Sequence, residues 1–142
     1  MMILPQVFAN SLVVLFVMIG LLTATPVQQT VPPPVLISPA EGAVMDNGCR
    51  DQSDSIDWDF DWEDVWGATL YHIKVWHNPE KPVVDDANLT ISEYKDVSRK
   101  SYIIEANRKG WCWTVRARVQ RKWGEWSEVR CFEVEPVDTD CP

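Results

Sequence analysis

Three aspartates at alternate positions come closest to a metal-binding motif. Asp57, Asp59 and Asp61 have the spacing of the first ligands of a calcium-binding loop. Such a loop needs a glycine at its sixth position, where this chain has Trp62. Aromatic residues separate the aspartates, and on a strand the three carboxylates would point to one side. We therefore interpret them as a solvated acidic stripe and predict neither a metal site nor a cofactor.

Catalytic chemistry has no recognisable motif either. His72 and His77 are the only histidines, and neither lies in a motif with a nucleophilic serine or cysteine. A small sandwich also fills its interior with its own side chains, and catalysis needs a pocket that excludes water. We predict that the chain is not an enzyme.

Four cysteines are better explained by disulfides than by zinc or by a reactive thiol. No CxxC or Cys/His spacing is present, and an even number of cysteines in an exported chain indicates two bridges. Four cysteines allow three pairings. The residues are Cys49, Cys112, Cys131 and Cys141.

The N-terminus predicts export. Leu12–Leu22 is an uncharged apolar run, followed by small residues around Ala24. Its length fits the apolar part of a signal peptide, here residues 1–25, although counting from Ile3 brings the segment towards the length of a membrane anchor. Asn88 begins an Asn-Leu-Thr glycosylation sequon. We expect a secreted, extracellular glycoprotein, with an uncleaved anchor as the alternative.

The charge of the chain excludes two classes of partner. Its formal net charge is −8 and its pI is near 4.6. Nucleic acid and anionic lipid are bound by basic surfaces. We expect no nucleic-acid partner, and no membrane contact once the signal is cleaved.

The elements that must position these residues are short strands. A Pro-rich linker, residues 26–34, precedes apolar residues that alternate with polar ones at period two, and no segment shows a sustained helical period. Phe60, Trp62, Tyr71 and Trp113 fall on inward phases and are the predicted core. Residues 78–88, with two prolines, are expected to be a loop or a weak edge. The predicted strands are residues 35–37, 56–62, 71–75, 90–94, 102–104, 111–120 and 127–135.

Three segments resemble fibronectin type III domains. Residues 62–75 (WEDVWGATLYHIKV) resemble that family's second strand, turn and third strand, and residues 34–42 (PVLISPAEG) resemble its first strand. Residues 111–118 (WCWTVRAR) resemble its sixth strand, with Trp111 where the family usually has a tyrosine. The resemblance implies an all-β, seven-stranded, immunoglobulin-like sandwich over residues 35–136, followed by a tail, residues 137–142.

A second resemblance is narrower. Residues 123–127 (WGEWS) are similar in spacing to the WSxWS box of cytokine receptors, with Gly124 in place of the first serine. In that family the box tryptophans interleave with arginines of the neighbouring strand. The resemblance implies a Trp–Arg ladder of Trp123, Trp126, Arg116, Arg118 and Arg130.

The predicted strands narrow the disulfide pairing. Cys112 and Cys131 lie outward on facing strands of one hairpin, so a cross-strand bridge is expected. In a fibronectin type III-like fold, the loop before the second strand and the end of the last strand share a pole. That placement implies a Cys49–Cys141 bridge, which would tie down the C-terminal tail.

These features predict a binding module. Loops 63–69 and 120–125 share a pole of the fold, and Trp66, Trp76 and Trp123 are candidates for surface contact. Trp66 and Trp76 could instead cover the sheet edge. We expect a non-catalytic extracellular binding or adhesion module whose ligand is a protein. The alternatives are a soluble cytokine-receptor-like domain or a carbohydrate-binding module that uses exposed tryptophans; the oligomeric state is left open.

Overall fold

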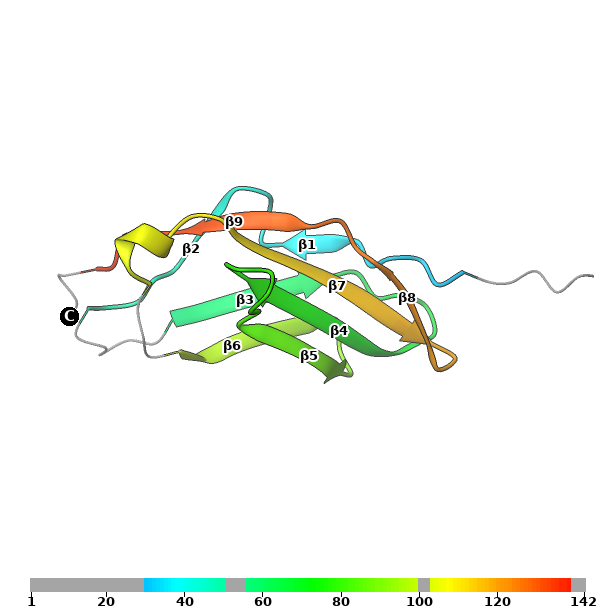
Figure 1. Ribbon diagram of the computed structural model, residues 1–142. Helices are drawn as coiled ribbons and strands as arrows, with labels where there is room; N and C mark the ends of the chain where they lie inside the picture. The colour runs from blue at the N-terminus through cyan, green and yellow to red at the C-terminus, as the bar shows by residue number, and fades with distance from the viewer. Residues whose placement is uncertain (1–29, 51–55, 100–102, 139–142) are drawn as a thin grey trace, which may run out of the picture.

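The fold is a sandwich of two β-sheets (Figure 1). The computed structural model describes residues 30–50, 56–99 and 103–138. The smaller sheet has the order β1-β3-β6, and the larger has the order β2-β9-β7-β4-β5, with β8 also paired to β7. The strands are β1 (Leu36–Ser38), β2 (Ala43–Met45), β3 (Ile56–Trp62), β4 (Ala68–Trp76), β5 (Val84–Leu89), β6 (Glu93–Arg99), β7 (Trp111–Val119), β8 (Lys122–Trp126) and β9 (Arg130–Val134).

This strand order is fibronectin type III-like, with the first and last strands each broken in two. The first strand begins in the smaller sheet as β1 and, after a turn, continues in the larger sheet as β2, parallel to β9. The last strand is divided into β8 and β9, which pair successively with β7. The seven strands of such a sandwich are therefore nine segments in the described part of the chain, and the predicted class of all-β sandwich is confirmed.

Of the two alternatives for residues 78–88, a loop or a weak edge, the structure has the edge: Val84–Leu89 is the last strand of the larger sheet and pairs with β4. Two other local predictions are wrong. The predicted strand 90–94 is a connection that leads into β6, which begins only at Glu93. The predicted strand 102–104 is not formed at Ile103 and Ile104, which precede a short 3-10 helix, Glu105–Asn107.

The core lies between the sheets and is aromatic. Phe60, Trp62, Tyr71 and Trp113 are each exposed by 4% or less, as their inward phases predict. Rings from opposite sheets meet at tilted angles, with centroids 5.1 Å apart for Phe60 and Trp113 and 5.5 Å apart for Trp62 and Tyr71. Aromatic pairs favour such geometries, so burial and ring contact act together here.

Two buried polar side chains fix the connections between strands. Trp111 donates from its indole nitrogen to the carbonyl of Asn107, at 2.7 Å. It thereby makes the backbone bond four residues upstream that the corner tyrosine makes in immunoglobulin-like sandwiches. Asn47 is fully buried and bonds the backbone of Ile103 and Glu135, which joins three distant segments.

Among the described residues, no helix is long and apolar enough to cross a membrane.

Candidate binding surface

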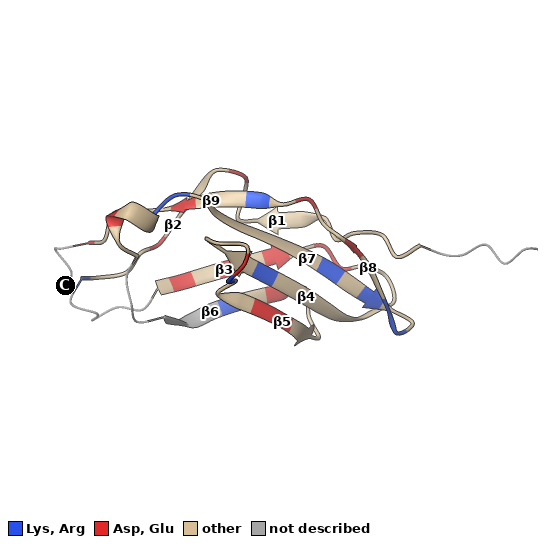
Figure 2. Ribbon diagram, in the orientation of Figure 1, with Lys and Arg blue, Asp and Glu red and all other residues tan. Residues whose placement is uncertain are grey.

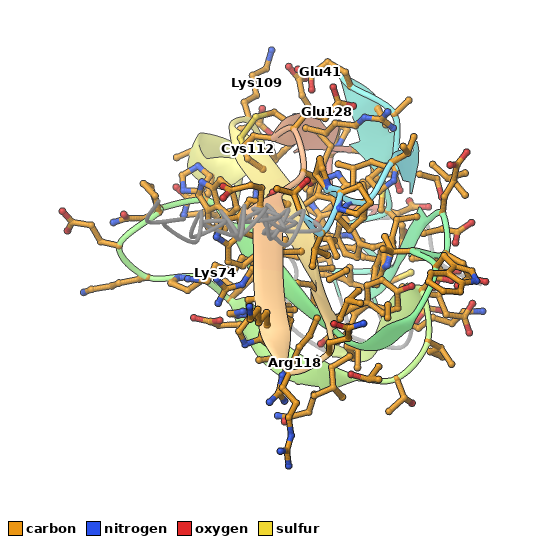
Figure 3. All side chains as sticks on the ribbon, turned by 90° about the vertical axis from the view of Figure 1, so that its right-hand side faces the viewer. Glu41, Lys74, Lys109, Cys112, Arg118 and Glu128 are labelled. Atoms are coloured by element: carbon orange, nitrogen blue, oxygen red, sulfur yellow. A yellow bond between two sulfur atoms is a disulfide. The ribbon has the colours of Figure 1, made fainter. Side chains whose placement is uncertain are left out.

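The outer face of the larger sheet carries a stack of alternating cations and indole rings. Its members are Lys74, Trp126, Arg116, Trp123 and Arg118, which we call the Trp–Arg stack. They come from three neighbouring strands, β4, β7 and β8. Figure 3 shows Lys74 and Arg118 on this face.

Arg116 is the centre of the stack. Its guanidinium carbon lies 4.5 Å from the ring centroid of Trp126 and 4.9 Å from that of Trp123. Arg118 lies over the ring of Trp123 at 5.9 Å. These distances are within the range of cation–π attraction, so each indole is held by charge as well as by packing.

Arg130 is not a member of the stack, and Lys74 takes the end position. The Lys74 ammonium lies 5.4 Å from the ring centroid of Trp126. Arg130 follows the break between β8 and β9, so its guanidinium pairs with Glu128 at 2.9 Å and donates to the carbonyl of Ile37 at 3.2 Å. Four of the five residues that the WGEWS resemblance implies therefore lie in the stack, and Arg130 does not.

A histidine and an aspartate complete the stack from the side. His72 is 8% exposed and lies beside both rings, with centroids 4.8 Å from Trp126 and 5.7 Å from Trp123. Its Nε2 lies 2.5 Å from an Asp85 oxygen, and its Nδ1 accepts from Arg116 at 3.1 Å. Because a ring nitrogen that accepts from a guanidinium carries no proton, the proton sits on Nε2 and is donated to Asp85.

The pKa of the Asp85 carboxyl is lowered by this arrangement. The hydrogen bond from His72 is the largest cause, and the charge of Lys74, 3.7 Å away, acts in the same direction. Sequence reasoning missed His72 and Asp85. The available signal was the alternation of β4, which places His72 on the same face as Lys74.

The WGEWS segment has a second structural role at its serine. Ser127 is buried, and its hydroxyl accepts from the amide of Val115 at 3.1 Å. Its own amide donates to the Val115 carbonyl at 2.7 Å. The serine thus keeps the chain attached to β7 where β8 ends.

Gly124 stands where the linker crosses β8. A side-chain carbon at this position would lie 2.7 Å from Cβ of Val31, which is closer than real contacts allow. Val31 is partly buried against the core. The glycine therefore lets the linker pack directly against β8, where the side chain of a serine would occupy the same space.

The two predicted contact loops do share one end of the sandwich (Figure 1). Ala68, at the start of β4, pairs with Val119, at the end of β7, and a Cβ on Gly67 would be 3.5 Å from the Val119 side chain. The tight turn at the tip of the second loop has positive φ at Gln120 and Arg121. The predicted loop 120–125 is therefore only this turn, because β8 begins at Lys122. We call the end formed by residues 63–69 and 119–122 the loop pole.

Trp66 projects from the loop pole and is 87% exposed. Its loop is held from below, because the Tyr71 hydroxyl accepts from the amide of Val65 at 2.9 Å. Burial raises the pKa of the Tyr71 phenol and Asp64 adds to the rise, although the Val65 bond opposes it. The loop thus presents a large ring from a fixed backbone.

The other candidate tryptophans lie elsewhere. Trp76 is half-buried at the far end of β4, where it pairs with Cys112. Nine residues of strand separate the two ends of β4, which is about 30 Å. Trp123 is half-buried in the Trp–Arg stack. Neither ring therefore forms a common platform with Trp66.

One predicted disulfide is present in the described residues. Cys112 and Cys131 face each other on β7 and β9 and are bonded, with S–S 2.04 Å. Cys49 is also disulfide-bonded, and its backbone bridges that of Asp138. Cys141 lies outside the described residues, so the Cys49–Cys141 pairing stays a prediction.

Acidic residues mark β3 of the smaller sheet, and cations mark β4 and β7 of the larger one (Figure 2). On β3, Asp57 and Asp59 are exposed and Asp61 is half-exposed, so the three form an outward acidic stripe. Lys74, Arg116 and the other cations of the stack lie on the larger sheet. The described residues contain no group of three His, Cys, Asp or Glu side chains placed to hold a metal ion.

Comparison with known proteins gives a likeness of fold only. The sequence matches no known protein family, and no curated protein matches it. Among solved structures, the chain is similar to an Fn3-like protein from Clostridium thermocellum, with a TM-score of 0.42 and 14% identity over 72% of this chain and 99% of that one.

Proposed function

We propose that this chain is a secreted, non-catalytic module that binds an extracellular protein through the loop pole. The observation that carries the proposal is the exposure of Trp66 on a loop fixed by Tyr71. Fixed, exposed tryptophans are enriched among the residues that dominate protein interfaces, because they bury a large area at a small cost in side-chain entropy.

Charge around Trp66 favours a protein ligand. Glu63 and Asp64 lie on one loop of the pole, and Arg121 and Lys122 lie on the other. A central aromatic ring with a mixed polar rim is the usual composition of a protein interface. Because Trp66 and Trp76 lie at opposite ends of β4, a sugar platform built from both rings is not supported.

The binding test compares two exposed apolar residues. Trp66→Ala removes the ring at the loop pole, and Val44→Ala removes a 66% exposed side chain on β2. We would screen the secreted chain for binding to a panel of purified extracellular proteins and to a glycan array. We expect a protein ligand whose affinity falls at least about 30-fold in Trp66→Ala and is unchanged in Val44→Ala. The unfolding midpoints of both variants should stay close to that of the parent.

Two results would contradict this proposal. Equal loss of binding in both variants would remove the loop pole from the interface, and binding to the glycan array alone would favour a carbohydrate-binding module.

Export is tested separately, by the N-terminal sequence of protein collected from the medium of a eukaryotic cell. We expect that sequence to begin near residue 26.

The Trp–Arg stack favours one narrower candidate, a soluble cytokine-receptor-like domain. Arg116 between Trp123 and Trp126 is the arrangement that the WGEWS resemblance implies. This candidate predicts nanomolar or tighter binding to a four-helix cytokine in the same screen. A ligand of any other architecture would exclude it.

A further inference from the structure

A shallow pocket lies where the chain crosses from the larger sheet to the smaller one. Leu89 still pairs with Tyr71 on β4, whereas the Ser92 carbonyl already accepts from the Trp62 amide on β3. The pocket spans this connection and the start of β6, and its volume is about 410 Å³. It thus bridges the two edge strands β5 and β6.

The lining of the pocket combines an apolar floor with polar edges. Leu89 and Tyr94 are partly buried against the core, and Ile91 is 55% exposed. Glu93 and Lys95 are exposed beside them. A sugar ring has the matching chemistry, because its C–H face packs on aromatic and aliphatic side chains while its hydroxyl and amide groups need polar partners.

The glycosylation sequon lies on the wall of this pocket. Asn88 and Thr90 are exposed, and Leu89 between them points inward. The backbone amide of Asn88 donates to the Asp86 carboxylate at 2.9 Å, which fixes the end of β5. A sugar attached to Asn88 would be held beside Tyr94 at a high effective concentration.

We propose that this pocket seats the first N-acetylglucosamine of a glycan on Asn88. In the attachment step, the side-chain amide nitrogen bonds to C1 of a sugar carried by a lipid pyrophosphate, the C1–oxygen bond to pyrophosphate breaks, and the amide loses one proton. This inference rests on the export part of the proposed function. A seated sugar would also cover the outer edges of β5 and β6, which pair with no further strand in the described part of the chain and are the edges at which other chains can pair.

The test measures thermal unfolding of the full chain, exported from eukaryotic cells behind a heterologous signal peptide. Asn88→Gln removes the sequon and Thr90→Ser keeps it. Digestion of the glycan to a single N-acetylglucosamine separates the first sugar from the rest. We expect the glycan to raise Tm by about 2–5 °C, and the single sugar to keep most of that rise.

A displaced glycan provides the matched control. Gly67→Asn in the Asn88→Gln background creates a sequon that ends at Thr69, and asparagine tolerates the positive φ at this position. A glycan at the loop pole should give no comparable rise in Tm. Ile91→Ser, at the open side of the pocket, should reduce the rise at Asn88 by half or more.

Three results would overturn the proposal: an unmodified Asn88 in the exported chain, an equal rise from the displaced glycan, or a full rise in Ile91→Ser. Isotope-labelled N-acetylglucosamine gives a second readout, because the seated sugar should show nuclear Overhauser contacts to the Tyr94 ring. Their absence would likewise overturn it. Since the signal is heterologous, these results do not depend on natural export or on ligand binding at Trp66.

Discussion

At the scale of single residues, Arg116 carries the surface architecture of the larger sheet. Its guanidinium carbon lies within 5 Å of two indole rings, and the guanidinium donates to His72. His72 in turn donates to Asp85 on β5. One planar cation therefore connects three strands through stacking and hydrogen bonds that an ammonium group cannot reproduce together.

We predict that Arg116→Lys destabilises the fold by about 1–3 kcal/mol. Two cation–π contacts weaken and the bond to His72 Nδ1 is lost, each worth about 0.5–1 kcal/mol or slightly more. Arg118→Lys is the control, because Arg118 lies over one ring only, at 5.9 Å. Urea unfolding followed by tryptophan fluorescence measures both. Equal effects of the two substitutions would show that charge alone, rather than planar stacking, holds the indoles.

At the scale of elements, the predictable strands are those with buried residues at every second position. β3 and β7 match their predicted ranges to within a residue, because alternation of aromatic and polar side chains is visible over their whole length. The Cys112–Cys131 bond follows from the same phases. β5 has only Val84 fully buried and carries Asp85 and Asp86, so its pattern resembles a loop.

Beyond the Trp–Arg contacts that the WGEWS resemblance implies, the sequence does not reveal which side chains of neighbouring strands meet on the outer face. Lys74 and His72 alternate as outward residues of β4, which usually means exposure to solvent. Rings from β8 cover them, and which strand lies beside which is a property of the whole topology. The displacement of Arg130 has a similar cause, because the break after β8 changes the phase of the chain.

The linker packs against β8 at Gly124, and this contact leads to a prediction. Gly124→Ser restores the serine of a WSxWS box, yet its side chain would meet Val31 at 2.7 Å. We expect a loss of about 1–3 kcal/mol, typical of an overpacked site. Differential scanning calorimetry measures it.

A double variant identifies the cause of that loss. Val31→Gly removes the side chain that the new serine would meet, so Gly124→Ser should cost much less in the Val31→Gly background. An equal cost in both backgrounds would show that the Val31 side chain is not the cause, since the Val31 carbonyl, 3.0 Å from the added carbon, remains in Val31→Gly.

At the scale of the whole molecule, the two ends of the sandwich differ in construction. The loop pole carries Trp66 and lies at the end where the linker leaves the domain (Figure 1). At the other end, the chain after β9 returns to the segment before β3. The amide of Arg50 donates to the Asp138 carbonyl, and the amide of Asp138 donates to the Gly48 carbonyl. The loop pole therefore exposes a large aromatic side chain, whereas the opposite end joins the chain after β9 to the segment before β3 by backbone hydrogen bonds.

The end opposite the loop pole leads to a prediction for the Cys49–Cys141 disulfide. Asp138, three residues before Cys141, already pairs with Cys49, so a Cys49–Cys141 bond needs only a short further run of chain. It would close a loop of about 90 residues, against a sequence separation of 19 for Cys112–Cys131. Longer closed loops restrict the unfolded chain more. Removing Cys49–Cys141 should therefore cost about 4–5 kcal/mol, and removing Cys112–Cys131 about 3 kcal/mol. Paired Cys→Ala variants in urea unfolding give this comparison, and non-reducing peptide mapping gives the pairing.

A peptide joining Cys49 to Cys112 or Cys131 would refute the pairing. A larger loss from the Cys112–Cys131 variant would mean that local strand pairing outweighs loop closure in this sandwich.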